Sequence, residues 1–271
     1  MKTRVALILF LFCFLLFPAM GFAKGDTTET ILTLSGLKRS VESIPSSLAM
    51  NLSSEDSLEM TPGERKLVAA RISAAFQARD LYGAVYKNVK ENFDSKMIPD
   101  LMNLFRNPVY QKMVRFEAES DRPEMKNERK KFKEDFQSNP PDRERINLIL
   151  RMMAVTNAED TNVQFEFLVT KGILVALNAT KPQEQQLTKV KFDLMMGKVR
   201  EEMEKSIKSD LVLELLFTYR KATNQELSIY TSLLQSDEDR ELNRLADAGL
   251  MKALEASVGK AGKSASNVSV K

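Results

Sequence analysis

The chain has 271 residues, a formal net charge of +3, one cysteine, and neither histidine nor tryptophan. The lack of histidine excludes Ser-His-Asp and Cys-His catalysis, and with a single cysteine it also excludes a Cys/His zinc site. A nearly neutral chain has no net field to hold a polyanion, so we expect no nucleic-acid partner, and no motif indicates a cofactor.

The first 23 residues have the three parts of a secretory signal. Lys2 and Arg4 precede the apolar run Val5–Phe17, and small residues then precede a cleavage site after Ala23. The alternative is an uncleaved anchor, because the longer segment from Val5 to Ala23 is just long enough to span a bilayer. Cleavage predicts a periplasmic or secreted protein that is not integral to the membrane. It also removes the only cysteine, Cys13, and lowers the formal charge to +1.

The sequence after the signal predicts helices almost throughout, beginning with a capping box at Thr61–Glu64. We expect this helix to continue to about Lys90. Its apolar residues recur at spacings of three, four and seven, which is typical of a buried helical stripe. The predicted stripe is Leu67, Ala74, Ala78, Leu81, Val85 and Val89.

Capping residues divide the next segment into short helices. Asp94 is expected to cap one helix, and Asn107 the next. The charged stretch 121–135 predicts an exposed helix. The turn-forming residues at 139–142 mark the clearest break, so we place the boundary between an N-terminal unit (24–138) and a C-terminal unit (139–257) there.

The second half predicts a helix to about Thr156, another over 160–177, and a long helix from about Thr180 to Tyr219. Thr223 opens a second capping box, and Ser236 is expected to cap the last helix. Residues 258–271 are rich in Ser, Gly and Lys, which predicts a disordered tail.

The two halves correspond at a constant offset of 129 residues. This shift places Asp94 on Thr223 and Asn107 on Ser236, and apolar positions fall on apolar positions. We therefore predict an all-α fold of two similar multi-helix units packed together, formed by an internal repeat.

The C-terminal pattern resembles an uncharacterised family of exported Gram-negative proteins, domain of unknown function 2059. The residues that carry the resemblance are Phe217-Thr218-Tyr219, Thr223, Glu226-Leu227, Tyr230, Leu233-Leu234 and Ser236. The family's last helix opens with Ser-Pro-x-Gly, and the segment 236–239 lacks both Pro and Gly. The resemblance covers about 60 residues in each half. It implies an all-helical exported domain with no established activity, and it supplies no catalytic residues.

Two residue groups invite a metal-binding interpretation, and each has a simpler structural one. The acidic cluster Asp237–Asp239 follows the cap Ser236, where carboxylates stabilise the positive end of a helix. The methionine pairs Met152-Met153 and Met195-Met196 are dispersed along the chain, which favours core packing over copper binding. We expect no metal site.

Two basic groups are the candidate partner-binding residues. The stretch 122–133 includes Lys130 and Lys131, which could contact anionic lipid or an acidic partner, although a solvated helix explains the pattern too. Tyr219, Arg220 and Lys221 end the long helix of the C-terminal unit, and cations are also common at helix C-termini.

The leading functional hypothesis is a non-enzymatic exported protein that binds a periplasmic protein or a hydrophobic ligand. The oligomeric state stays open. A lipid carrier is a further alternative, and it requires a continuous apolar cavity between the units. The competing hypothesis is an enzyme acting on cell-envelope carbohydrate through two carboxylates about 5–10 Å apart. Two such carboxylates, buried in one pocket with raised pKa values, would contradict the binding hypothesis.

Overall fold

The computed structural model describes residues 26–53, 60–136 and 138–263. The regular elements in these ranges are all helical, which confirms the predicted all-α class. They are α1 (Thr27–Leu34), α2 (Leu37–Ser53), α3 (Pro62–Ala75), α4 (Ala78–Asn92), η1 (Ser95–Met97), α5 (Ile98–Phe105), α6 (Pro108–Ser120), η2 (Pro123–Met125), α7 (Lys126–Phe136), α8 (Arg143–Val155), α9 (Ala158–Asn178), η3 (Gln183–Gln185), α10 (Lys189–Thr218), α11 (Asn224–Leu233) and α12 (Asp237–Ala261). The predicted signal lies outside the described residues.

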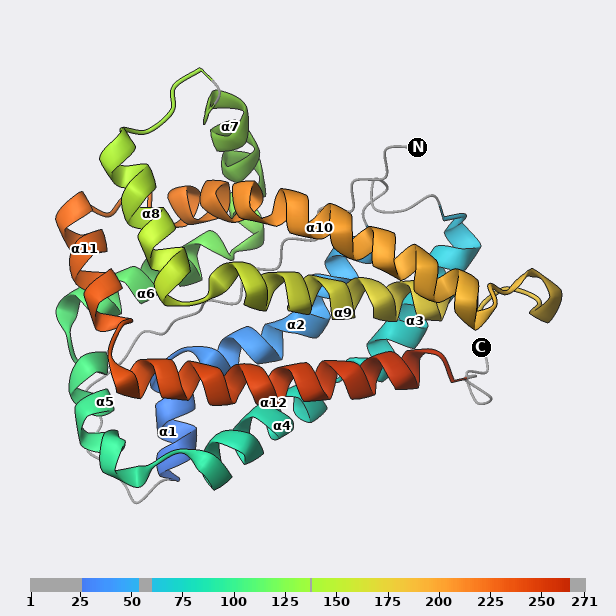
Figure 1. Cartoon of the computed structure of the whole chain (residues 1–271), viewed down its shortest axis with the longest axis horizontal. Coiled ribbons are helices and arrows are strands. Elements are labelled where there is room, and N and C mark those ends of the chain that lie inside the picture. Colours follow the sequence, from blue (N-terminus) through green and yellow to red (C-terminus); the bar gives the residue numbers. More distant parts are fainter. Residues whose placement is uncertain (1–25, 54–59, 137, 264–271) are drawn as a thin grey trace.

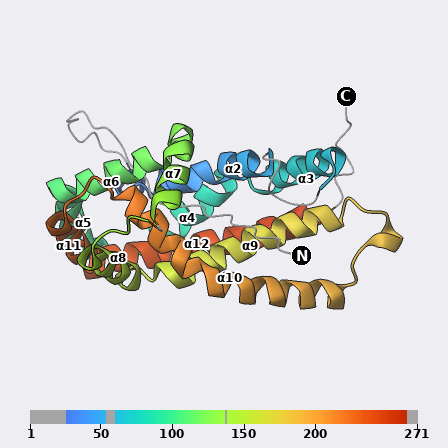
Figure 2. The same cartoon turned by 90° about the horizontal axis from the view of Figure 1, so that it is seen from above.

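The long helices α9, α10 and α12 run lengthwise through the molecule, while α5, α6, α8 and α11 gather at one end (Figures 1 and 2). The most extensive helix contact joins α12 to α4, and the next joins α12 to α9. A single hydrophobic cluster contains residues from α1 to α12. The two predicted units therefore share one core, because α12 of the second unit packs against α4 of the first.

Gly249 allows α12 to approach α4 closely. A Cβ atom at this position would lie 2.9 Å from the carbonyl oxygen of Ala84 and 3.0 Å from Cα of Val85. Asn88 adds a polar tie, because its Nδ2 donates to the carbonyl of Leu245 at 2.7 Å. The absent side chain of Gly249 thus sets the spacing of the two helices.

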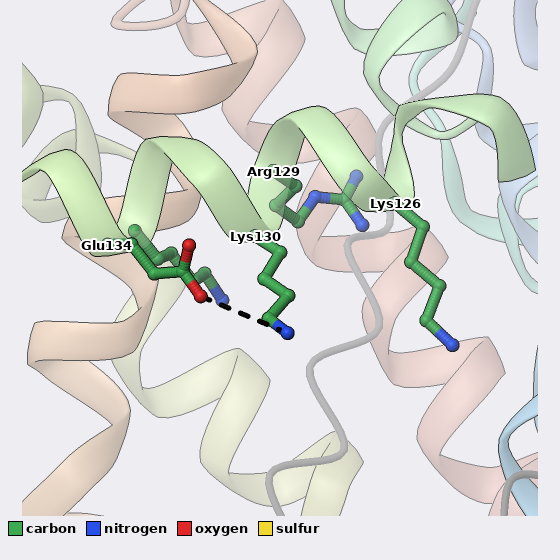
Figure 3. A pocket seen from close by; sticks show the side chains of 5 residues that line it. Lys126, Arg129, Lys130 and Glu134 are labelled. Carbon is green, nitrogen blue, oxygen red and sulfur yellow. Dashed lines mark ion pairs between the residues drawn. The ribbon is translucent and has the colours of Figure 1, made fainter.

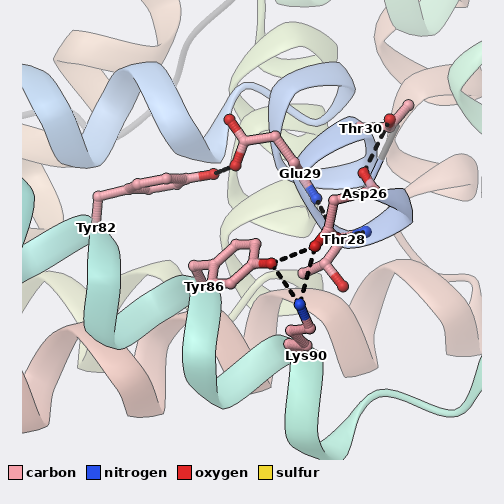
Figure 4. Close-up of polar contacts among 7 residues, drawn as sticks. All are labelled: Asp26, Thr28, Glu29, Thr30, Tyr82, Tyr86 and Lys90. Atoms are coloured by element: carbon pink, nitrogen blue, oxygen red, sulfur yellow. Dashed lines mark hydrogen bonds and ion pairs between the residues drawn. The ribbon is translucent and has the colours of Figure 1, made fainter. Parts of the chain in front are cut away.

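Polar contacts fix α1 against α4 (Figure 4). Asp26 caps α1 and accepts from the hydroxyl of Tyr86 and from Nζ of Lys90, the latter at 2.9 Å. The hydroxyl of Tyr82 donates to Glu29. The bonds from Tyr86 and Lys90 hold the pKa of Asp26 well below its usual range. The first described residues are therefore tied to α4 at Asp26.

The predicted caps are confirmed. Thr61 and Thr223 form full capping boxes, and Asn107 and Ser236 accept from backbone N–H groups at the starts of α6 and α12. The starts of α6 and α12, Pro108 and Asp237, lie 129 residues apart, as the proposed offset requires. The internal repeat itself remains a prediction.

The single helix expected from Thr61 to Lys90 is wrong. Phe76, with φ −100° and ψ 71°, separates α3 from α4, and its fully buried ring lies against Gly172. The break changes the buried face, so Leu67 is 46% exposed and Val68 is buried in its place. Burial of an aromatic ring outweighed the continuous helical periodicity.

Other boundaries also differ from expectation. The long helix begins at Lys189 with Thr188 as its cap, because the segment after Thr180 forms a loop containing η3. Helix α12 continues to Ala261, since Val258 and Ala261 are buried in the core. The predicted disordered tail thus begins too early, and residues 264–271 lie outside the described residues.

Among the described helices, none is both long and apolar enough to cross a bilayer.

The close approach of α12 to α4 can be tested by filling the space at Gly249. We predict that Gly249→Ala lowers the free energy of unfolding by about 1–3 kcal/mol, because the helices must separate. Gly83→Ala, on α4, is the matched control. Apart from the neighbouring backbone of α4 itself, no atom lies within 4 Å of a Cβ there, so the higher helix propensity of Ala should stabilise the fold by up to about 1 kcal/mol. Urea unfolding of both variants measures the effects, and equal stability of the two would contradict this packing.

Candidate functional site

An enclosed polar site lies where α12 meets the turn between α8 and α9. An inner chamber of about 80 Å³ is lined on its apolar side by Leu37, Tyr110, Met152, Leu215 and Leu234. An outer cleft of about 680 Å³ adjoins it. Six residues line both spaces: Thr156, Thr161, Leu234, Asp239, Asn243 and Asp247. We call the chamber and cleft together the junction cavity.

The turn between α8 and α9 shapes one wall of the junction cavity. Asn157 has φ 50°, in the left-handed region that Asn tolerates better than most residues. This conformation separates α8, which ends at Val155 with Thr156 as its C-cap, from α9, which begins at Ala158. Thr156 and Thr161 consequently line the cavity on the two sides of the turn.

Helix α12 supplies the opposite wall with a row of polar side chains. Asp239, Asn243 and Asp247 are spaced four residues apart, which places them along one face of the helix. Asn243 Nδ2 donates to Oδ2 of Asp239 at 2.8 Å. Ser236 Oγ accepts from the backbone N–H of Asp239 at 3.2 Å, so the helix cap also positions this carboxyl.

Both carboxyl groups of this row have raised pKa values. Burial raises the pKa of Asp239 to about 7, against the opposing effect of its hydrogen bond with Asn243. Burial also raises the pKa of Asp247 to about 6, against its hydrogen bond with Thr161. Near neutral pH these groups are close to their titration points, and a bound cation would favour their charged forms.

A buried carboxyl lies behind the chamber. The Tyr110 ring packs edge-on against Tyr230 at 5.5 Å between ring centroids. The hydroxyls of Tyr219 and Tyr230 donate to Oε1 of Glu117 at 2.5 and 2.8 Å. Oε2 of Glu117 has no hydrogen-bond partner among the described residues, and burial raises the pKa of this carboxyl to about 8. Glu117 is therefore mostly uncharged at neutral pH.

Tyr219, one of the predicted partner-binding residues, is 1% exposed and belongs to this buried network. Its carbonyl accepts from Arg145 at 2.5 Å. Its hydroxyl is turned into the core, away from any partner at the surface. Arg220 stacks over Phe217 at 4.0 Å, and Lys221 pairs with Glu119.

The other two predicted residues, Lys130 and Lys131, are exposed on α7. This helix docks on α10 through Glu214, which pairs with Arg129 at 3.0 Å and with Lys133 at 2.6 Å. Figure 3 shows the outer side of α7, where Lys130 lies 3.9 Å from Glu134 beside a shallow depression of about 620 Å³.

A further ion pair joins the two predicted basic groups. Arg220 pairs with Glu128 of α7 at 3.3 Å. The structure thus brings the end of α10 next to α7, and it uses several of these charges to hold the two helices together.

Sequence reasoning missed the junction cavity and Glu117. The available signal for Glu117 was an acidic residue four positions after Met113, on the apolar face of α6. The acidic cluster was interpreted as a helix start, which Ser236 confirms, but Asp239 also lines the cavity. The cluster therefore has a second role, lining the cavity through Asp239, which the helix-capping pattern did not indicate.

Within the described ranges, no group of three or more potential Asp, Glu, Cys or His ligands is arranged to hold an ion. The methionines Met152, Met153 and Met196 are core residues.

Comparisons with known proteins give no match to a family model, a curated protein or a solved structure. The resemblance to domain of unknown function 2059 therefore remains a prediction.

The buried carboxyls make stability depend on pH between about 5 and 8. Burial raises the pKa of Glu117 and of Glu166 to about 8 and that of Asp239 to about 7. In the unfolded chain these groups titrate near pH 4. At pH values between the unfolded and the folded pKa of each group, the native state binds more protons than the unfolded state. The free energy of unfolding therefore falls as pH rises.

We predict that the melting temperature falls from pH 5 to pH 8, and that Glu117→Gln reduces this slope because Gln carries no titrating proton. Glu119→Gln on the same helix is the control. Lys221 lowers the pKa of Glu119, so it titrates below this range. Calorimetry across the pH range measures the slopes. A slope in Glu117→Gln equal to that of the unsubstituted protein would show that Glu117 is not a protonated buried acid.

Proposed function

We propose that the protein is an exported, non-enzymatic helical binding protein, and that its ligand is a small organic molecule with a protonated amine that enters the junction cavity. The observation that carries the proposal is the row of Asp239, Asn243 and Asp247 facing a chamber with an apolar side. Binding sites commonly combine an apolar wall with a few convergent polar groups and perturbed pKa values.

The electrostatics of the row favour a cation. Burial penalises the charged forms of Asp239 and Asp247. One hydrogen bond to each carboxyl, from Asn243 and from Thr161, partly offsets this penalty. An ammonium group beside Asp239 would supply the missing opposite charge and hydrogen-bond donors for that carboxyl. The apolar side chains Tyr110, Met152 and Leu234 would then contact a short hydrocarbon portion of the ligand.

The size of the chamber limits that hydrocarbon portion. A volume of about 80 Å³ is well below the roughly 300–1,000 Å³ typical of drug-sized ligands. A lipid carrier would need a continuous apolar cavity, so the geometry favours a short amine over a lipid or a large hydrophobic ligand.

A carbohydrate-acting enzyme remains the second candidate, because Asp239 and Asp247 are two carboxyls with raised pKa values on one cavity, as that hypothesis requires. Their placement counts against it. Eight residues on one helix correspond to a rise of about 12 Å, whereas paired glycosidase carboxylates are about 5–10 Å apart and flank the bond they cleave. Asp239 and Asp247 both lie on the α12 wall of the cavity, so they do not flank a bound substrate.

Binding can be tested with butylamine and its neutral counterpart butanol. At pH 7.5 we expect butylamine to raise the melting temperature and butanol to have little effect, because only the ammonium compensates the carboxylates. Asp239→Asn should abolish the difference. Asp193→Asn is the control, since Asp193 is exposed on α10 and forms an ion pair with Lys189. Equal responses to the two compounds would contradict the proposal. If the unsubstituted protein released sugar from cell-wall glycan and neither Asp239→Asn nor Asp247→Asn did so, the protein would be an enzyme instead.

A further inference from the structure

Exposed apolar side chains concentrate where the chain enters α10. Leu187, Val190 and Leu194 are 39%, 69% and 67% exposed. They account for half of the large apolar residues found exposed in the described parts of the chain. We call residues 181–198 the α10 tip. Single exposed apolar residues are ordinary, but a group within eight residues indicates an interaction surface.

Core packing does not explain these residues. Thr188 caps α10, and Val190 and Leu194 then lie four residues apart on one face. Phe192 and Met196 lie on the opposite face and are buried against the body of the protein. The first turns of α10 therefore have two apolar faces, of which only one is covered.

Further along α10 the outward face becomes charged. The positions that continue the line of Val190 and Leu194 are Glu201, Lys205 and Lys208, and all three are exposed. The apolar outward face is thus confined to the α10 tip and is not a property of the whole helix.

Lysines lie close to the apolar group in the sequence. The α10 tip contains four lysines and two carboxylates: Lys181, Lys189, Lys191 and Lys198 against Glu184 and Asp193. Lys189 pairs with Asp193 at 2.5 Å. The excess of positive charge around an apolar centre is the pattern of segments that bind anionic membrane surfaces.

The α10 tip also has an accessible position. The loop with η3 and the start of α10 project from one end of the molecule, beyond the neighbouring helices (Figures 1 and 2). A planar surface could therefore meet the α10 tip without contacting the junction cavity, which lies near the other end of α9.

We propose that the α10 tip docks the protein on an anionic phospholipid surface. Leu187, Val190 and Leu194 enter the boundary between head groups and acyl chains, and Lys191 and Lys198 contact lipid phosphates. A second copy of the chain fits less well. Three side chains provide far less than the roughly 800 Å² that each partner buries in a stable dimer, and the surrounding lysines of two copies would repel one another.

Vesicle binding tests this proposal. Protein from an exporting host is mixed with vesicles of phosphatidylcholine alone or with an equal share of phosphatidylglycerol. Mass spectrometry of the N-terminus checks that all variants have the same leader state. We expect binding to the anionic vesicles, with slower hydrogen exchange at residues 187–198. The double variants Val190→Ser/Leu194→Ser and Lys191→Gln/Lys198→Gln should each lose at least tenfold in affinity and this slowing of exchange.

Leu67→Ser is the matched control, because Leu67 is 46% exposed on α3, outside the α10 tip. It should bind as the unsubstituted protein does, and melting curves confirm that each variant is folded. The proposal is overturned if residues 187–198 exchange equally with and without anionic vesicles, or if both double variants bind undiminished. It is also overturned if the apolar residues instead maintain a dimer that does not bind vesicles, as light scattering would show.

Discussion

The arrangement of the molecule depends on the close packing of α12 against α4. Helix α12 belongs to the C-terminal half and α4 to the N-terminal half, yet the two make the most extensive contact in the described structure. Gly249 permits this approach, because any side chain there would meet the backbone of α4. With α12 held between α4 and α9, its polar face is presented to the turn between α8 and α9. The junction cavity is thus a consequence of how the two halves join.

Buried polar groups connect this packing to the proposed binding site. Glu117 of α6 accepts hydrogen bonds from Tyr219 and Tyr230, so one carboxyl links α6 to the end of α10 and to α11. Tyr230 in turn packs against Tyr110, which lines the chamber. In a protein without histidine, buried carboxyls such as Glu117 and Asp239 can change protonation near neutral pH, because burial raises their pKa values to about 8 and about 7. Export, amine binding and membrane docking are separate proposals, and the cavity and the α10 tip lie in different parts of the fold.

Local signals in the sequence predicted the local structure well. The caps at Thr61, Asn107, Thr223 and Ser236 were identifiable because each needs only a hydroxyl, amide or carboxylate at a fixed spacing from a helix start. Periodicity failed at Phe76, where burial of the ring against Gly172 ends α3. Local patterns also failed to predict which residues form the site. Asp239 and Glu117 each satisfy a local pattern, and only the tertiary packing of α12, α9 and α6 shows that both are buried.

The measurement that tests the central claim most directly is an NMR titration of the side-chain carboxyl carbon of Asp239, assigned with Asp239→Asn. If α12 presents this carboxyl to an enclosed cavity that receives an amine, its titration midpoint should lie near 7. Added butylamine should move the midpoint downward, because the ammonium stabilises the carboxylate. A midpoint near 4 that butylamine does not change would show a solvated carboxyl, and it would contradict both the cavity and the ligand proposed for it.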